Sequence, residues 1–265
     1  MTLLYNEQVA LITGASRGLG AALARRFAAA GARVALVARS EGLLQDVASE
    51  IQRSGNIAKP FPCDLRDWDA FEALVREVVA EWGRIDILVN AVGAQCNGSV
   101  EETPQAVALE LIQVNYLGPL ACCRAVLPMM RQQGSGHIVN IASVLGWRAT
   151  PERSAYAASK AALISLTDAL RCEVAGSGIS VTLVCPGRVE KDRTSTKTHT
   201  AYAQSLKAAT EKIFSGIERG KRYVVLSSAG RVLRWLGMLA PGLVDRLVVA
   251  QRRREQKPQA RDRSS

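Results

Sequence analysis

The stretch Val9–Gly20, which reads VALITGASRGLG, constrains the fold of this chain most strongly. An apolar, strand-like run leads directly into a loop with Gly14, Gly18 and Gly20, and an alanine-rich helix is predicted over Ala21–Ala30. Glycines let such a backbone turn tightly, approach a pyrophosphate without an intervening Cβ, and pack the helix on the strand. Free amides in the first helical turn and the helix dipole also favour an anion. The pattern predicts a phosphate site, although a tight strand-to-helix turn in another α/β protein has the same glycines.

Strands and helices alternate regularly along the rest of the chain. Short apolar runs such as 85–89 are typical of strands that are buried on both faces of a parallel sheet. Ser40 stands where it can cap the helix that follows it. We therefore predict an α/β fold, a doubly wound parallel sheet with right-handed crossovers and helices on both faces. The predicted strands are 9–13, 33–38, 57–62, 85–89, 138–142 and 179–185, and the predicted helices are 21–30, 41–54, 68–82, 104–132 and 154–175.

Length and charge fit one such domain with a basic tail. The chain has 265 residues and neither an internal repeat nor a low-complexity linker. Its net charge is +10, but residues 226–265 alone hold nine Lys or Arg against three acids. The body is only mildly basic, so the charge does not indicate a nucleic-acid partner.

The six cysteines show no Cys-x-x-Cys spacing, and most of them lie in apolar segments. We expect free thiols in a reducing compartment, with neither a disulfide framework nor a metal site. Residues 1–8 lack the pattern of a signal peptide, and charges interrupt every apolar run long enough to span a membrane. The expected location is therefore intracellular, in the cytoplasm.

Ligands of a doubly wound sheet bind beyond the carboxyl ends of its strands, so the residues there are the candidates. An NAD-binding chain usually has an acid after its second strand, where it accepts hydrogen bonds from ribose hydroxyls. Here Arg39 follows that strand, and Arg17 lies in the glycine loop. Two guanidinium groups favour a 2′-phosphate and hence NADP over NAD, unless both are solvated surface arginines. Asp64 follows the third strand, as a partner for an adenine amino group or as an acid at the start of the next helix.

Tyr156 and Lys160 lie four residues apart at the start of a predicted helix, so they share one face. An ammonium group beside a phenol favours the phenolate and lowers the tyrosine pKa toward the range useful for proton transfer. Ser143 ends the preceding strand, within reach of the tyrosine and of a substrate carbonyl. Asn115 adds a polar group inside an apolar helix, where it either serves this site or satisfies the backbone at a kink.

At these residues the chain resembles the short-chain dehydrogenase/reductase family, over about 7–225. The motifs that carry the resemblance are Thr13-Gly14-x-x-x-Gly18-x-Gly20, Asp64, Asn90-x-x-Gly93, Asn115, Ser143, Tyr156-x-x-x-Lys160 and Pro186-Gly187. The resemblance implies a Rossmann-type sheet of about seven strands, NADP(H) as cofactor, and hydride transfer at the nicotinamide C4.

The resemblance also assigns roles to residues. Tyr156 is the implied general acid and base, Ser143 orients the carbonyl oxygen, Lys160 holds the nicotinamide ribose and tunes Tyr156, and Asn115 supports a water-linked proton path. The implied cofactor contacts are Gly14, Ser16, Arg17, Gly18, Leu19, Gly20, Arg39, Asp64, Leu65, Asn90, Gly93, Tyr156, Lys160, Pro186, Gly187 and Val189.

Two positions depart from the family pattern. Asn90-Ala91-Val92-Gly93 stands where the family often has Asn-Asn-Ala-Gly, which removes one amide side chain from the sheet. Lys191 stands where a threonine often touches the cofactor amide, and Thr194 is the nearest substitute.

The chain divides into a predicted catalytic domain, 1–225, and a basic amphipathic extension, 226–265. The family builds its substrate lid at about 188–220, which is polar and threonine-rich here before it becomes helical. In the extension, apolar residues alternate with arginines, and Pro241-Gly242 interrupts them. This composition predicts a helical hairpin that lies on an anionic membrane surface, or that packs on the cleft or on a partner subunit.

The sequence leaves three functions open. The leading hypothesis is an NADPH-dependent reductase of a lipophilic ketone or aldehyde, working as a homo-oligomer on a small-molecule substrate. A 3-oxoacyl-thioester reductase is the alternative, because Arg148 and Arg153 between Ser143 and Tyr156 are suited to attract phosphates. The third hypothesis is an NADP-sensing binding protein without turnover.

Overall fold

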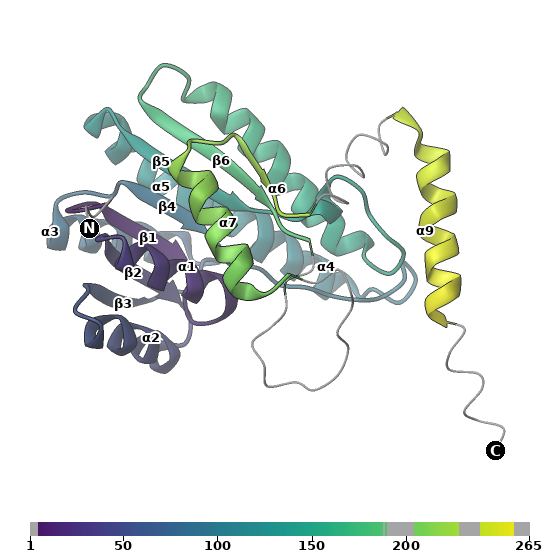
Figure 1. Ribbon diagram of the computed structural model, residues 1–265, viewed down its shortest axis with the longest axis horizontal. Coiled ribbons are helices and arrows are strands. Elements are labelled where there is room, and N and C mark those ends of the chain that lie inside the picture. The colour runs from purple at the N-terminus through teal and green to yellow at the C-terminus, as the bar shows by residue number, and fades with distance from the viewer. Residues whose placement is uncertain (1–4, 188, 190–203, 228–238, 257–265) are drawn as a thin grey trace.

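The computed structural model describes residues 5–187, 189, 204–227 and 239–256. Its centre is a single sheet of seven parallel strands in the order β3-β2-β1-β4-β5-β6-β7 (Figure 1). The strands are β1 Val9–Thr13, β2 Arg33–Ala38, β3 Ala58–Pro62, β4 Ile87–Asn90, β5 Gly136–Ile141, β6 Ile179–Cys185 and β7 Tyr223–Val225. The predicted doubly wound fold is confirmed.

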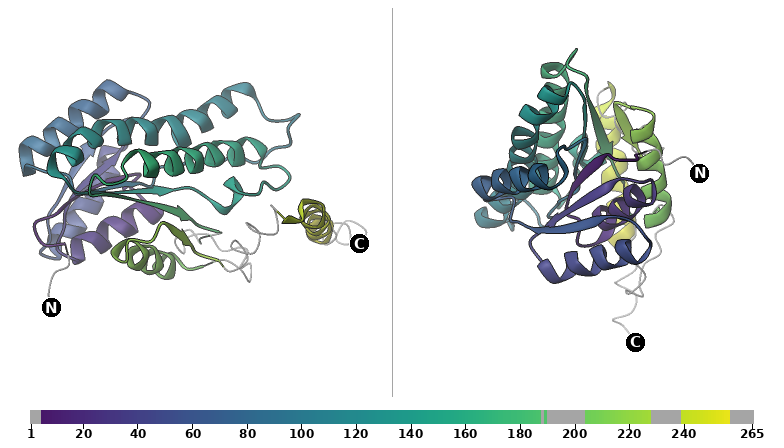
Figure 2. Two further views of the ribbon diagram at one scale, coloured as in Figure 1. Left: turned by 90° about the horizontal axis from the view of Figure 1, so that it is seen from above. Right: turned by 90° about the vertical axis from the view of Figure 1, so that its left-hand side faces the viewer.

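Helices cover both faces of the sheet (Figures 1 and 2). Successive residues of β1 point to opposite faces, so Ala10 and Ile12 pack in one core while Val9 and Leu11 pack in the other. The first core is closed by α1 Gly18–Ala29, α2 Glu41–Arg53 and α7 Leu206–Glu218. The second is closed by α3 Trp68–Trp82, by the run α4 Gln105–Ile112, η1 Gln113–Leu117 and α5 Gly118–Gln133, and by α6 Ser154–Glu173.

Two predicted boundaries and one predicted helix interior differ from the structure for physical reasons. Helix α1 begins at Gly18 instead of Ala21, because the glycine loop itself turns into the helix. Strand β4 begins at Ile87, two residues later than predicted, because the preceding Asp86 turns its carboxylate to the start of β1. The predicted helix 104–132 contains a single π-helical turn, η1, in its middle.

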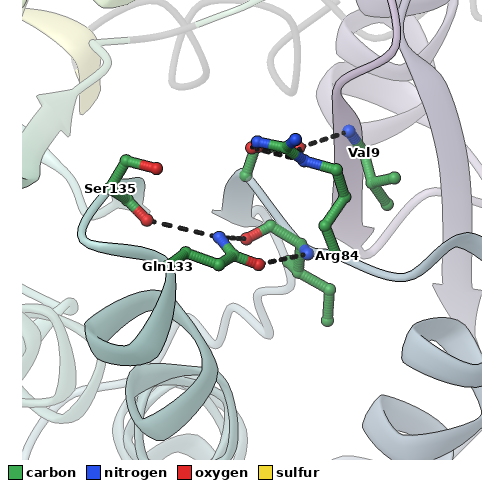
Figure 3. A network of polar contacts seen from close by, with 6 residues as sticks. Val9, Arg84, Gln133 and Ser135 are labelled. Atoms are coloured by element: carbon green, nitrogen blue, oxygen red, sulfur yellow. Dashed lines mark hydrogen bonds and ion pairs between the residues drawn. The ribbon is translucent and has the colours of Figure 1, made fainter.

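The amino end of the sheet is tied together by side chains (Figure 3). The Asp86 carboxylate accepts a hydrogen bond from the backbone nitrogen of Val9 at 2.9 Å and pairs with the guanidinium of Arg84. Gln133 at the end of α5 accepts from the backbone nitrogen of Ile85 at 3.2 Å and donates to the same residue's carbonyl at 3.0 Å. This network joins β1, the approach to β4 and α5, and it closes the end of the sheet opposite to the predicted site.

One helix among the described residues, Gln105–Gln133, is long and apolar enough by composition to cross a membrane. In this fold it is the run α4-η1-α5, and its Leu111, Cys122, Val126 and Met130 are buried in the domain. Its apolar character is therefore explained by its place in the second core.

The C-terminal extension contributes one described helix, α9 Pro241–Gln256, which stands apart from the layers at one end of the molecule (Figures 1 and 2). The predicted interruption at Pro241-Gly242 is the first turn of this helix, where proline is tolerated because its missing N–H has no intrahelical partner there. The predicted first half of the hairpin, up to residue 238, lies outside the described residues.

Candidate active site

Close backbone contacts shape the glycine loop. Gly14 has a φ of +68°, and a Cβ on it would lie 2.8 Å from the backbone nitrogen of Val92. A Cβ on Gly20 would collide with the backbone of Gly14. The loop therefore lies directly against the chain that leaves β4, and the first turn of α1 contains no acidic residue. A helix start of this kind presents free amides and a favourable dipole to an anion, so the loop fits the pyrophosphate of a dinucleotide.

Two arginines flank this loop. Arg17 is the N-cap of α1 and is exposed, while its neighbours Ser16 and Leu19 are half-buried. Arg39 is exposed directly after β2, which pairs with β1. Both guanidinium groups therefore stand at the carboxyl end of adjacent strands, outside the cores.

Asp64 is already engaged by a neighbour. Its carboxylate accepts from the side chain and from the backbone nitrogen of Arg66, the latter at 3.1 Å. These bonds hold the Asp64 pKa below its usual range, and the nearby charge of Arg39 acts in the same direction. The helix-start interpretation of Asp64 was wrong, because Asp67 caps α3 through the backbone nitrogen of Ala70.

The following Leu65 is a buried apolar contact. A Cβ on Gly118 would lie 3.2 Å from its Cβ, so Leu65 packs on the helix at the end of η1. This contact joins the end of β3 to the helix that carries Asn115.

The Asn90 side chain is turned into the protein interior. Its Nδ2 donates to Oδ1 of Asn140 at 2.8 Å, and Nδ2 of Asn140 donates to the Thr167 hydroxyl at 3.0 Å. This buried chain of amides links β4, β5 and α6. The side chain of Asn90 is therefore engaged inside the protein, so only its backbone atoms can make the predicted contact with a cofactor. Asn140 and Thr167 were not predicted, although a polar residue inside the apolar strand 138–142 was a signal.

Ser143 and Tyr156 meet at the carboxyl end of β5. Ser143 directly precedes the short 3₁₀ helix η2, Val144–Gly146, and Tyr156 lies in the first turn of α6. The two side chains are hydrogen-bonded, and both are largely buried. Burial raises the pKa of the phenol, whereas the bond with Ser143 and the nearby charge of Arg153 lower it. The expected lowering of the Tyr156 pKa was therefore wrong, because burial outweighs the effects that lower it.

Lys160 lies one helical turn after Tyr156 and is only 3% exposed. Its Nζ donates to the carbonyl of Ile141 at 3.0 Å. Burial lowers the Lys160 pKa to about 8, with a small opposing effect from Cys185 at the end of β6. Cys185 also acts on the pKa of Tyr156, so this thiol is a neighbour of the site that sequence reasoning missed.

Asn115 lies in the π-helical turn η1 and is fully buried. Its side chain donates to the carbonyl of Ala94 and accepts from the nitrogen of Ala94, both at 2.9 Å. Its Nδ2 also donates to Ser159 Oγ at 2.9 Å, and that hydroxyl donates to the carbonyl of Tyr156. Asn115 thus satisfies backbone, as one interpretation held, but the backbone belongs to the loop after β4 instead of its own helix. The role of Ser159 was not predicted.

Gly93 keeps the space between Asn115 and Lys160 open. A Cβ on Gly93 would lie 3.5 Å from both Oδ1 of Asn115 and Nζ of Lys160. All members of the predicted tetrad therefore lie around one end of α6, in the order Asn115, Lys160, Tyr156 and Ser143.

The loop after β6 closes the other side of the site. The carbonyl of Pro186 accepts from the nitrogen of Val144 at 3.2 Å, which fixes the loop beside Ser143. Gly187 faces the side chain of Ser227, and Val189 forms a parallel bridge with Gln204. Lys191, Thr194 and most of the predicted lid, 188 and 190–203, lie outside the described residues.

Of the two arginines considered for thioester phosphates, Arg148 is occupied. It forms an ion pair with Asp245 of α9 and donates to the carbonyl of Pro241 at 3.4 Å. Arg153 lies close enough to Tyr156 to lower its pKa, as described above. The phosphate contacts of the two arginines stay predictions, and Arg148 would have to leave Asp245 to make one.

All six cysteines are in the thiol form, as predicted.

A glycine cradle at the first strand of a doubly wound sheet, with a serine, tyrosine and lysine beyond the fifth strand, defines an NAD(P)-dependent dehydrogenase or reductase. Residues 8–201 match the model of the short chain dehydrogenase family. The chain therefore belongs to the short-chain dehydrogenase family.

Known relatives agree over most of their length. The chain is 33% identical over 258 residues to ketoacyl reductase HetN of Nostoc sp., covering 93% of this chain and 90% of that one. It is 34% identical over 276 residues to dehydrogenase/reductase SDR family member 7B of Bos taurus, covering 97% and 85%. Among solved structures, a metagenomic short-chain oxidoreductase in complex with NADP matches with a TM-score of 0.71 and 34% identity, covering 80% of this chain and 91% of that chain.

Proposed function

We propose that this chain is an NADPH-dependent reductase that interconverts a lipophilic ketone or aldehyde and its alcohol. The observation that carries the proposal is the hydrogen-bonded pair Ser143 and Tyr156 with the buried Lys160 one turn further along the same helix. A structural pair would have no reason to keep a buried ammonium group one helical turn from a tyrosine at the end of the sheet where ligands bind.

Each side chain then has one task. Tyr156 donates its proton to the substrate oxygen as the carbonyl is reduced, and Ser143 holds that oxygen in position. Lys160 offers its ammonium group to the ribose hydroxyls and to the phenolate as it forms. Asn115 fixes the loop at Ala94 and faces the space beside Gly93, which suits a water molecule that returns the proton. The bound NADPH supplies the hydride, and the glycine loop described above fits its pyrophosphate.

Arg17 and Arg39 support the preference for NADPH, and so does the relative solved with NADP. Charge-assisted contacts to the 2′-phosphate are expected to favour NADPH over NADH by about 1.5 to 3 kcal/mol. Replacement Arg39→Ala should remove about 1 to 2 kcal/mol of this difference and leave NADH binding nearly unchanged. Titration of both cofactors into both proteins measures it, and equal affinities of the wild type for the two cofactors contradict it.

A 3-oxoacyl thioester is the second candidate substrate. Two relatives carry the name ketoacyl reductase, HetN at 33% identity and a putative ketoacyl reductase of Streptomyces coelicolor at 35%. With Arg148 held by Asp245, Arg153 is the arginine left in this loop for the phosphates of such a substrate. A panel of long-chain ketones, steroids and acyl thioesters, followed by NADPH oxidation, separates the two candidates. Cofactor binding without oxidation of NADPH by any substrate would favour an NADP-sensing binding protein instead.

The proposal includes the organisation of the chain. Residues 1–225 form the catalytic domain, with the lid at about 188–220, and residues 226–265 form the basic extension. The enzyme works in the cytoplasm as a homo-oligomer, and its extension is its contact with a membrane surface. Val100 and Leu109 are large apolar side chains left exposed, at 77% and 54%, which supports burial in an assembly. Light scattering on the full chain measures the oligomeric state.

A further inference from the structure

The ion pair between Arg148 and Asp245 determines which side of α9 faces away from the domain. Asp245 reaches Arg148, and the adjacent Val244 is 1% exposed, so both belong to the inner side of the helix. Residues two apart on an α-helix differ in direction by about 200°. Leu243 is therefore opposite Asp245, and Arg246 is opposite Val244.

The opposite side of α9 is apolar and cationic. On α9, Leu243, Arg246 and Ala250 follow one another at steps of three or four residues, and Leu239 lies two residues before the helix. All four are exposed, Leu239 at 79% and Leu243 at 52%. We call these four residues the outer strip. It contains no acid, and Asp245 on the inner side of the helix is paired with Arg148. The sequence adds three consecutive arginines, 252–254, near the end of the same helix.

We propose that the outer strip docks this enzyme on an anionic lipid surface, and that the substrate enters the cleft from that surface. Leucines that insert among acyl chains and arginines that meet anionic headgroups are the two contributions such binding needs. A second copy of α9 is a poorer occupant, because symmetric packing of the strip brings Arg246 against itself without an acid to pair with.

The position of α9 links this surface to the substrate. Arg148 lies in the segment that joins Ser143 to Tyr156, so the helix is attached to the chain between these two site residues. The carbonyl of Glu152 in the same segment accepts from the nitrogen of Gly98, which joins the loop after β4 to this segment. A lipid surface held by α9 therefore lies beside the segment between Ser143 and Tyr156, and the substrate class becomes carbonyl compounds dissolved in the bilayer. This last step rests on the proposed reductase activity, whereas docking does not.

Flotation with the full chain tests the docking. Phosphatidylcholine vesicles with phosphatidylserine should capture the protein at low salt, and those without phosphatidylserine should capture much less. The double replacement Leu243→Glu with Arg246→Glu should reduce the partition coefficient about tenfold or more, because the net charge falls by three units and an apolar contact is lost. A matched control, Leu43→Glu with Arg53→Glu, changes an exposed leucine and arginine on α2 and should bind like the wild type. Equal capture of the double variant and the wild type overturns the proposal, and so does a wild type that forms α9-dependent dimers without binding vesicles.

Activity measurements test the route of the substrate. The double variant on α9 should reduce a short, water-soluble ketone at the wild-type rate and a long-chain ketone supplied in anionic vesicles several-fold more slowly. Equal rates on both substrates would overturn entry from the bilayer. If vesicles capture the protein but no carbonyl compound is reduced, the proposed function fails while the docking stands.

Discussion

The two ends of the sheet differ in how fully their buried polar side chains are paired. At the amino end, the Asp86 carboxylate is paired with Arg84 and accepts from Val9, and Gln133 uses both ends of its amide on Ile85 (Figure 3). At the carboxyl end, the buried Lys160 donates a hydrogen bond to the carbonyl of Ile141, and no carboxylate pairs with it in the part of the chain that the structure describes.

This difference separates stability from chemistry. A buried polar group with all its partners stabilises the fold, and removing one partner is costly. A buried ammonium group without a counter-charge destabilises the folded state, and its lowered pKa records that cost. The amino end therefore contributes to stability, while the carboxyl end retains charge and space that a cofactor and a substrate can use.

The largest effect is expected from Tyr156→Phe, which removes the transferable proton and little else. Loss of general acid catalysis should lower kcat by about a hundredfold or more. NADPH affinity and the thermal midpoint should change little, because the ring remains. Steady-state kinetics together with a cofactor titration measure this, and a variant with most of its activity shows that another group supplies the proton.

Replacement Lys160→Met should separate the contribution of this residue to catalysis from its effect on stability. Activity is expected to be lost, while the folded state at pH 7 gains up to about 3 kcal/mol, since a pKa lowered from 10.5 to about 8 reflects a cost of that size. Above pH 8 the folded wild type loses this proton before the unfolded chain does, so its stability rises with pH. The advantage of the methionine variant should therefore shrink between pH 8 and 10.5. Urea unfolding across this range checks it, and a variant less stable than the wild type at pH 7 contradicts it.

The fold was predictable because its signals are local. Apolar runs such as 85–89 indicate the strands, and the glycine loop at 14–20 indicates the first turn. Each of these patterns spans only a few residues, and together they predict six of the seven strands. The short β7 at 223–225 entered only through the family resemblance.

The supporting contacts of the site were not predictable, because they join residues far apart in the sequence. Asn90 meets Asn140 across 50 positions, and Asn115 meets Ser159 across 44. The π-helical turn at Asn115 follows from its bond to Ala94 across a loop, which no helical period indicates. The ion pair of Arg148 with Asp245 likewise depends on where α9 comes to lie.

The amino end has a titratable group of its own, His137 in β5. Burial lowers its pKa from 6.5 to about 4, and its Nε2 lies 2.8 Å from the hydroxyl of Thr182. That hydroxyl donates to the carbonyl of Lys221, so Nε2 carries the proton of a neutral ring. The unfolded chain binds the second proton at a higher pH than the folded one. Stability present above pH 6.5 should therefore be lost as the pH falls toward 4, by up to about 3 kcal/mol. Urea unfolding of the wild type and of His137→Gln measures it, and parallel pH profiles of the two proteins contradict it.

The smallest effect, and the sharpest contrast with Lys160→Met, is expected from Asp86→Ala. This change leaves the buried nitrogen of Val9 without its side-chain partner and Arg84 without its counter-charge, which should cost about 2 kcal/mol of unfolding free energy. Asp86 lies at the end of the sheet away from Tyr156 and Lys160, so kcat and KM of the folded enzyme should stay within about twofold of the wild type. Asp86→Asn is the matched control: its amide oxygen still accepts from Val9, so its loss of stability should be clearly smaller than that of the alanine variant. Urea unfolding and steady-state kinetics on the same samples test both ends of the sheet together. If Asp86→Ala lowers kcat as strongly as it lowers stability, the two ends are coupled and the division between stability and chemistry is wrong.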